Sequence, residues 1–388
     1  MLATPHSRHL KNTADTTMSR SNLASVLLPF AILLAGCADD SPVGDVAEDD
    51  LNSRTIAAIA PADVSLLLPP PVDPSPTHLA PGTLGRGGAM IPTAVLSVLP
   101  KKLDHASTRE GQAYYESLRV VGVRLDPCAG TLGTEMTVGC TPQVRLVFQG
   151  MSAGSTDDGA LHAFYRVTRA QILSLVDFTV RERLARNVSA DAPLGVHPVA
   201  IAEGIRGRFV QSFFAKLQAL CGAENLERVT FIVREAGRPK AWSFGQFAVR
   251  AGTPAPLPVP TLTTDSQSLR GEVVSPMSPH PDNFLTLPPF DSTAVDRALR
   301  IENPNVHTPD TMACVECHQT QRVLALFPSG NRNEFRRWDV SSSVIGNDRD
   351  PENIHFFSYN GMHPSVSQRT GNETAAAVVR FRSLARGR

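Results

Sequence analysis

The sequence predicts an α+β fold, in which a mostly antiparallel sheet domain with helices on one face precedes a mainly helical domain. Short segments rich in β-branched and aromatic residues recur between residues 119 and 250, a pattern typical of strands. Two helical patterns interrupt the series. A proline-rich stretch at 251–263 then indicates a linker between two domains.

Five segments predict the strands of the sheet, because glycine, proline or aspartate bounds each of them. They are 119–125, 143–149, 160–167, 228–235 and 242–250. In 160–167 the alternation puts His162 on the face opposite Leu161 and Ala163. We interpret His162, and likewise His197, as structural rather than catalytic.

Two helices are expected between the third and fourth strands. The residues 168–171, TRAQ, have the form of a capping box, and apolar residues follow them at helical spacing. A second helix at about 206–221 carries Cys221 on its apolar face, where a thiol behaves as a small, inert hydrophobe. Further helices are expected near 293–301 and from about 372, where 370–373 again has capping-box form.

The N-terminus has the pattern of an export signal. A basic residue precedes the apolar run Leu23–Leu34, which is shorter than the about 20 residues that a spanning helix needs. This arrangement is typical of a secretory signal. The residues LAGC at 34–37 resemble the lipobox of bacterial lipoproteins. The resemblance implies cleavage after residue 36 and a lipid anchor on Cys37, the rival interpretation being an ordinary signal peptide.

The mature N-terminus is expected to hold the protein on a membrane. Residues 38 and 39 are Ala and Asp, so the inner-membrane retention signal known for this family is absent, which favours the outer membrane, facing the periplasm or the cell surface. Residues 37–85 are acidic and proline-rich, and we interpret them as a partly extended tether.

The charge balance disfavours a nucleic-acid partner. The chain has 37 basic and 37 acidic residues, and residues 1–36 hold three basic and one acidic, which leaves 34 against 36. A slightly acidic protein does not attract a polyanion.

Two cysteines of the sheet domain are expected to form a disulfide. Cys128 ends one predicted strand and Cys140 precedes the next, and free thiols are uncommon in an oxidising compartment. Closing this loop would stabilise the fold by roughly 3 kcal/mol.

A haem-attachment motif occurs at Cys314-Val-Glu-Cys317-His318. With six Cys and eleven His in 388 residues, a random chain would contain about 0.003 copies of this motif. Thiols one helical turn apart can add to the two vinyl groups of haem, and the next histidine then reaches the iron as proximal ligand. Thiol addition takes place in the exported compartment. The sequence therefore predicts one covalent haem c.

Three other interpretations of the motif stay open. A Cys314–Cys317 disulfide leaves the adjacent histidine unexplained. A zinc site of His307, Cys314, Cys317 and His318 has the right ligand types without the usual paired spacing. A thioredoxin-like redox pair would need a βαβ context, and the residues before the motif are typical of a loop.

The segment from about 293 to the end resembles a monohaem c-type cytochrome. In the helical version of that family a helix precedes the motif, a distal methionine follows it, and a C-terminal helix packs across the first. The resemblance implies Met362 as distal ligand, with His363 and His307 as alternatives. Methionine would raise the reduction potential, a second histidine would lower it, and an open position would permit ligand binding or peroxidase chemistry.

A second motif, GMSAG at 150–154, matches the nucleophile elbow of hydrolases. That chemistry needs a sharp strand-to-helix turn, whereas the residues that follow are typical of a turn and another strand. We interpret the motif as part of a hairpin.

The sequence thus predicts an exported, lipid-anchored c-type cytochrome that transfers one electron in the cell envelope to a partner protein. The alternatives are a haem sensor or peroxidase-like enzyme with an open axial site, and a non-haem binding or scaffold lipoprotein. The whole chain resembles predicted bacterial lipoproteins of no assigned function. The expected organisation is a signal peptide at 1–36, a tether at 37–85, an α+β domain at 86–250, a linker at 251–263 and a haem module at 264–388.

Overall fold

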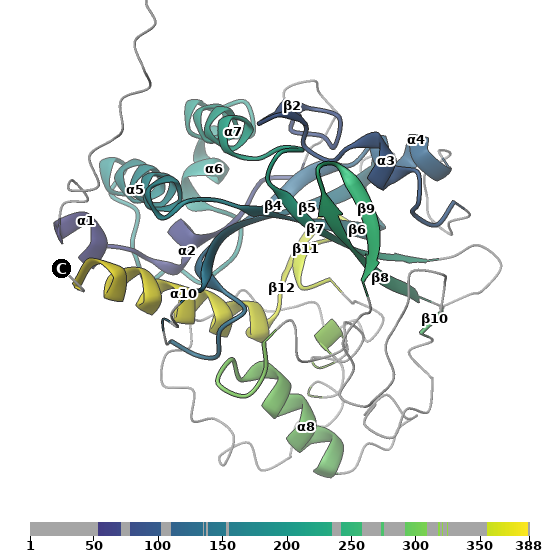
Figure 1. Ribbon diagram of the computed structural model, residues 1–388. Helices are drawn as coiled ribbons and strands as arrows, with labels where there is room; N and C mark the ends of the chain where they lie inside the picture. Colours follow the sequence, from purple (N-terminus) through teal and green to yellow (C-terminus); the bar gives the residue numbers. More distant parts are fainter. Residues whose placement is uncertain are drawn as a thin grey trace, which may run out of the picture. The chain divides into compact units, whose positions relative to one another are not determined.

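The computed structural model describes a sheet with helices and a C-terminal hairpin (Figure 1). The residues that it describes are 53–70, 78–101, 110–134, 136, 139–152, 155–234, 242–257, 273–274, 292–308, 317–318, 320, 324 and 355–386. All of them belong to one contact unit, Val46–Arg388. The predicted signal peptide, Cys37 and Cys314 lie outside the described residues.

The sequence predicts a mostly antiparallel sheet, and the described strand pairs of the main sheet are all antiparallel. Among the described residues it has eight strands in the order β1-β4-β5-β6-β7-β8-β10, with β9 also paired to β8. Their bounds are β1 Ser65–Leu67, β4 Arg119–Ala129, β5 Thr141–Ser152, β6 Ser155–Arg166, β7 Leu226–Arg234, β8 Trp242–Arg250, β9 Thr253–Leu257 and β10 Val273–Val274. All five predicted strands are present, and β9 begins inside the expected linker.

Helices cover one face of this sheet and bury its apolar positions in the main core. Helices α5 (Arg169–Ala185) and α7 (Arg208–Leu220) lie side by side over that face (Figure 1). The predicted capping box of α5 is confirmed: Gln171 N donates to Thr168 Oγ1 at 3.2 Å, and Thr168 N donates to Gln171 Oε1 at 2.8 Å. Cys221, directly after α7, is fully buried, as expected.

Part of the expected tether belongs to the fold. Helices α1 (Ser53–Ala57) and α2 (Pro61–Val64) lead into β1, which pairs with β4. Asp63 and Arg183 are both buried, and their carboxylate and guanidinium groups are 2.9 Å apart. Since a buried ion pair and an edge strand fix this segment in the core, the assignment of all of 37–85 to a tether is wrong for these residues.

Short elements connect β1 to β4 and β6 to β7. They are β2 Leu84–Gly85, β3 Gly88–Ala89, α3 Thr93–Leu96, α4 Gly111–Glu116 and α6 Pro198–Glu203. The expected disulfide joins the end of β4 to the start of β5, with the sulfurs of Cys128 and Cys140 at 2.02 Å. None of the helices described is long and apolar enough to cross a membrane.

The C-terminal elements pack on the sheet. They are α8 Ser292–Glu302, β11 Phe357–Asn360, β12 His363–Val366 and α10 Gln368–Arg386. Helix α10 runs beside β4 and α2 (Figure 1) and places Ala377 and Phe381 in the main core. The described residues therefore do not support a separate helical, cytochrome-like domain. The predicted cap at Thr370 is also wrong, because α10 begins earlier and Ser367 Oγ accepts from Thr370 N at 3.0 Å.

The β11–β12 hairpin covers part of the opposite face of the sheet. Tyr359 and Val366 form a second, small core there with Val121 and Val147. Gln149 on β5 fixes the hairpin: its amide donates to Tyr359 O at 2.7 Å, and its Oε1 accepts from Tyr359 N at 3.0 Å. C-terminal residues therefore cover part of this face of the sheet, which we call the hairpin face.

Candidate functional site

Two neighbouring cavities lie on the hairpin face of the sheet. The small cavity has a volume of about 130 Å³, and the large cavity has a volume of about 410 Å³. The small cavity lies between β5–β8 and the C-terminal segments that contain Cys317, His318 and Phe356. The described residues common to both linings are Arg124, Arg145, Arg228, Arg369 and Glu373.

Cys317 and His318 both line the small cavity. The imidazole of His318 stacks on Phe356, with ring centroids 4.5 Å apart and 7° between the planes. On its sheet side it lies 5.6 Å from the ring of Phe244 on β8. Two residues of the predicted motif therefore face a cavity with aromatic walls.

His162 lines the same cavity from the sheet. It lies on β6, opposite the core residues Leu161 and Ala163, as the alternation predicts. Burial lowers the pKa of His162 well below its ordinary value, and the positive charges of Arg145 and His318 lower it further. The imidazole is therefore neutral near pH 7.

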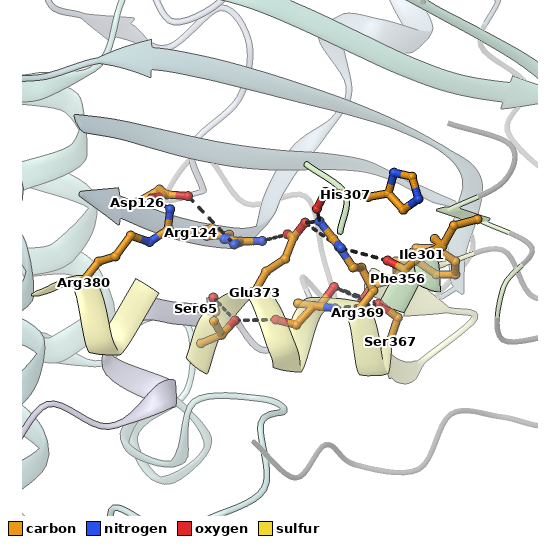
Figure 2. A network of polar contacts seen from close by, with 12 residues as sticks. Ser65, Arg124, Asp126, Ile301, His307, Phe356, Ser367, Arg369, Glu373 and Arg380 are labelled. Atoms are coloured by element: carbon orange, nitrogen blue, oxygen red, sulfur yellow. Dashed lines mark hydrogen bonds and ion pairs between the residues drawn. The ribbon is translucent and has the colours of Figure 1, made fainter. Parts of the chain in front are cut away.

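A network of buried ions lies where the two cavities meet and contributes side chains to both linings. Figure 2 shows a chain of contacts from Asp126 through Arg124 and Glu373 to Arg369. Arg369 is bound to Glu373 at 2.6 Å, and its guanidinium also donates to the carbonyl of Ile301 at 2.8 Å. Burial would raise the pKa of Glu373, but the charges of Arg124 and Arg369 outweigh it and hold this pKa far below its usual value.

Arg145 is one of the arginines that line both cavities, and it has no counter-ion among the described residues. Among the described residues it has no carboxylate partner within ion-pair distance, and its Nε has no hydrogen-bond partner. Its guanidinium lies 4.6 Å from the centre of the Phe164 ring, and that of Arg228 lies 4.3 Å from the same centre. Burial first, and then the charge of Arg124, lower the pKa of Arg145 to about 10. A buried, uncompensated cation favours an anion.

These side chains match the chemistry of haem. Cys317 supplies a thiol, His318 supplies an imidazole, and the aromatic rings suit a flat apolar macrocycle. The orphaned guanidinium of Arg145 suits the carboxylates that haem carries. Because ligand pockets measure about 300–1,000 Å³, the small cavity holds such a group only if the group also extends into the large one.

The structure places the three expected distal ligands elsewhere. Met362 is 38% exposed in the turn between β11 and β12, and His363 next to it is also exposed. His307 is partly buried, and its carbonyl oxygen accepts from Arg369 at 2.7 Å (Figure 2). None of the three is among the residues described as lining the small cavity.

The other open interpretations are constrained in part. Within the described parts of the chain, no group of three or more His, Cys, Asp or Glu side chains could hold a metal ion. Of the zinc ligands considered above that the structure describes, His307 does not line the cavity that contains Cys317 and His318.

The remaining sequence motifs are structural. Ser152 pairs with Ser155 where β5 and β6 form an antiparallel hairpin, so the interpretation of GMSAG as hairpin is confirmed. His197 is buried and stacks on Phe209 at 4.6 Å. Burial lowers its pKa to about 3, which keeps it neutral.

Sequence reasoning missed the arginines of the hairpin face. Arg124 and Arg145 occupy polar positions of alternating strands, and Glu373 lies in a helix. The sequence pattern that could have indicated them is a strand arginine between apolar neighbours, as in VRL at 123–125 and again at 144–146. A search of protein-family models, of curated proteins and of solved structures found no match to this chain.

Proposed function

We propose that this protein is an exported, lipid-anchored c-type cytochrome with one covalently bound haem, which carries single electrons in the cell envelope. The observation that carries the proposal is that Cys317 and His318 line a cavity whose far wall holds an uncompensated arginine. The sequence motif would supply the covalent attachment, and the aromatic and cationic side chains of the cavity support the proposal.

Each residue would have a separate task. Cys314 and Cys317 would hold the group through thioether bonds, and His318 would ligate its iron. Phe356 and Phe244 orient the imidazole of His318, and Arg145 would bind a carboxylate of the group. When bound there, haem supplies a one-electron couple at its iron.

The location of the protein is part of the proposal. The lipobox-like residues at 34–37 would place a lipid on Cys37, and the chain would face the periplasm or the cell surface. Thioether formation belongs to that compartment, so the export signal and the haem motif support each other.

The test is production of the exported protein in cells that contain the haem c maturation machinery. We expect a c-type pyridine haemochrome spectrum, and mass spectrometry should find one haem on the peptide containing Cys314 and Cys317. The substitutions Cys314→Ser and Cys317→Ser should each reduce the covalent haem. Cys221→Ala is the matched control, because Cys221 is buried outside the motif.

The proposal fails if the folded wild-type protein has no haem mass on that peptide while a known c-type cytochrome matures in the same cells. Far-ultraviolet circular dichroism distinguishes this outcome from misfolding.

A further inference from the structure

The position of His318 in the small cavity restricts where a second axial ligand of the proposed haem could lie. The two axial ligands of a haem iron approach from opposite sides of the macrocycle. His318 belongs to the C-terminal wall of the small cavity, where its ring stacks on Phe356. A ligand opposite His318 must therefore come from the sheet wall.

His162 is the described sheet residue in that wall with a suitable donor atom. The other sheet residues that line the small cavity have aliphatic, aromatic, hydroxyl, amide or guanidinium side chains: Arg124, Arg145, Val147, Ala160, Phe164, Arg228, Thr230, Ile232 and Gln246. An arginine stays protonated and cannot donate a lone pair. Imidazole nitrogen is a common ligand of haem iron.

The strand register places His162 close to His318. His162 pairs with Thr230, and Thr230 pairs with Gln246 on β8. Phe244, which contacts His318, is two residues before Gln246 on the same strand. Since residues two apart on a strand face the same side, Phe244 and His162 belong to one contiguous patch of the hairpin face.

The imidazole of His162 is also available. It makes an edge contact with Phe164, with ring centroids 6.5 Å apart, and the structure records no hydrogen bond from it to a described residue. Its backbone lies in a strand that is paired on both sides, to Val147 and to Thr230. A ligand on such a strand is held more rigidly than one in a turn.

His355 is the main competitor, because it also lines the small cavity. It immediately precedes Phe356, on the same wall as His318. Its Nδ1 lies 3.1 Å from Ser358 Oγ, and the residue is buried. His355 is therefore on the wrong side of the cavity to oppose His318.

We propose that His162 on β6 is the second axial ligand of the haem that Cys314, Cys317 and His318 bind. This inference rests on the proposed function. It replaces Met362, His363 and His307 by a residue of the sheet, so that iron ligation would join the C-terminal segment to the central strands.

The test uses the full-length, haem-loaded protein. We expect the oxidised wild-type protein to show the low-spin electron paramagnetic resonance and near-infrared bands of two imidazole ligands. Cyanide added to the oxidised protein, and CO added after reduction with dithionite, should leave the Soret band unchanged. His162→Ala should lose the low-spin signal and bind cyanide, and added imidazole should restore the low-spin spectrum. His162→Met should retain a low-spin spectrum and raise the reduction potential.

His355→Ala, Met362→Ala and His363→Ala are the controls, and each should keep the wild-type spectrum. If haem is bound but the wild-type protein is high-spin or shows a methionine-ligand band, His162 is not the ligand and the cytochrome proposal stands. The same conclusion follows if His162→Ala stays low-spin. If the wild-type protein contains no haem, both proposals fail. If His162→Ala does not fold, His162→Met decides the question: a methionine-ligand spectrum supports the proposal, and an unchanged two-imidazole spectrum overturns it.

Discussion

Arg124 on β4 and Glu373 on α10 form a buried ion pair between residues 249 positions apart in the sequence. The same carboxylate binds Arg369 at 2.6 Å, and Arg369 donates to carbonyl groups at Ile301 and His307. One acidic side chain therefore joins the sheet, the last helix and the end of α8. It also lines both cavities.

Replacing this carboxylate should destabilise the whole fold. Glu373→Gln leaves Arg124 and Arg369 buried without their counter-ion, and loss of one partner of a buried pair costs about 3–5 kcal/mol. The free energy of unfolding, measured with urea, should fall by that amount. Glu224→Gln is the control, because the Arg86–Glu224 pair is exposed and such a pair contributes less than about 1 kcal/mol. Equal losses in the two variants would contradict the role given to Glu373.

His197 should make stability depend on pH below neutrality. Its folded pKa of about 3 lies below the ordinary value of 6.5 because of burial and the charge of Arg183. Between these values the unfolded chain binds more protons, so stability rises with pH up to about 6.5 and is lost as pH falls. His197→Phe keeps a ring against Phe209 and should flatten the urea midpoint between pH 4.5 and 6.5. His162 contributes in the same direction, so part of the slope remains. Parallel slopes for wild type and variant would rule out this origin.

Local patterns predicted the elements that local interactions stabilise. The alternation of 160–167 separated His162 from Leu161 and Ala163 as the structure does, because side chains of a strand point to opposite faces in turn. The capping box at Thr168 is likewise a contact between residues three apart. It needs no information from elsewhere in the chain.

The features that the sequence did not predict depend on contacts between residues far apart in the chain. Nothing local in the proline-rich region around β1 distinguishes an edge strand from a tether, because its partner is β4. An arginine in an alternating strand has the same pattern whether it meets water or a cavity. Only the C-terminal hairpin over Val121 and Val147 makes this face a wall. Ser367 and Thr370 are both residues that can cap a helix, and the contacts of α10 with the sheet, rather than either side chain, place its start.

Gln149 should help to hold the hairpin on the sheet, together with Thr156, whose hydroxyl donates to the carbonyls of Tyr359 and Gly361. Gln149→Leu removes its hydrogen bonds to Tyr359 and to the carbonyl of Asp157. Because an unsatisfied buried polar group costs about 1–3 kcal/mol, the free energy of unfolding should fall by roughly 2–4 kcal/mol. The Tyr359 amide should also exchange faster with deuterium. Gln112→Leu is the control, since its partner Glu116 is exposed, and should change stability by less than about 0.5 kcal/mol. Unchanged exchange at Tyr359 would argue against this role.

Arg145 should set the reduction potential of the proposed haem. Its buried charge has no carboxylate within ion-pair distance among the described residues, so it would offset the charge of the haem carboxylate that it binds, and its removal would leave that carboxylate uncompensated. Reduction lowers the positive charge on the iron, and a nearby cation therefore favours the reduced form. Arg145→Gln should lower the potential by roughly 30–60 mV, about a three- to tenfold change in the one-electron equilibrium.

Spectroelectrochemical titration of the haem-loaded protein measures this shift. Arg181→Gln is the matched control, because Arg181 is largely exposed on α5 and paired with Asp177, and it should leave the potential unchanged. A potential that is the same in wild type and Arg145→Gln would mean that Arg145 does not lie beside the bound group. If the potential falls in both variants, a long-range effect of net charge is responsible, because the two substitutions remove the same charge. A fall in Arg145→Gln alone therefore places the redox centre against this wall of the sheet.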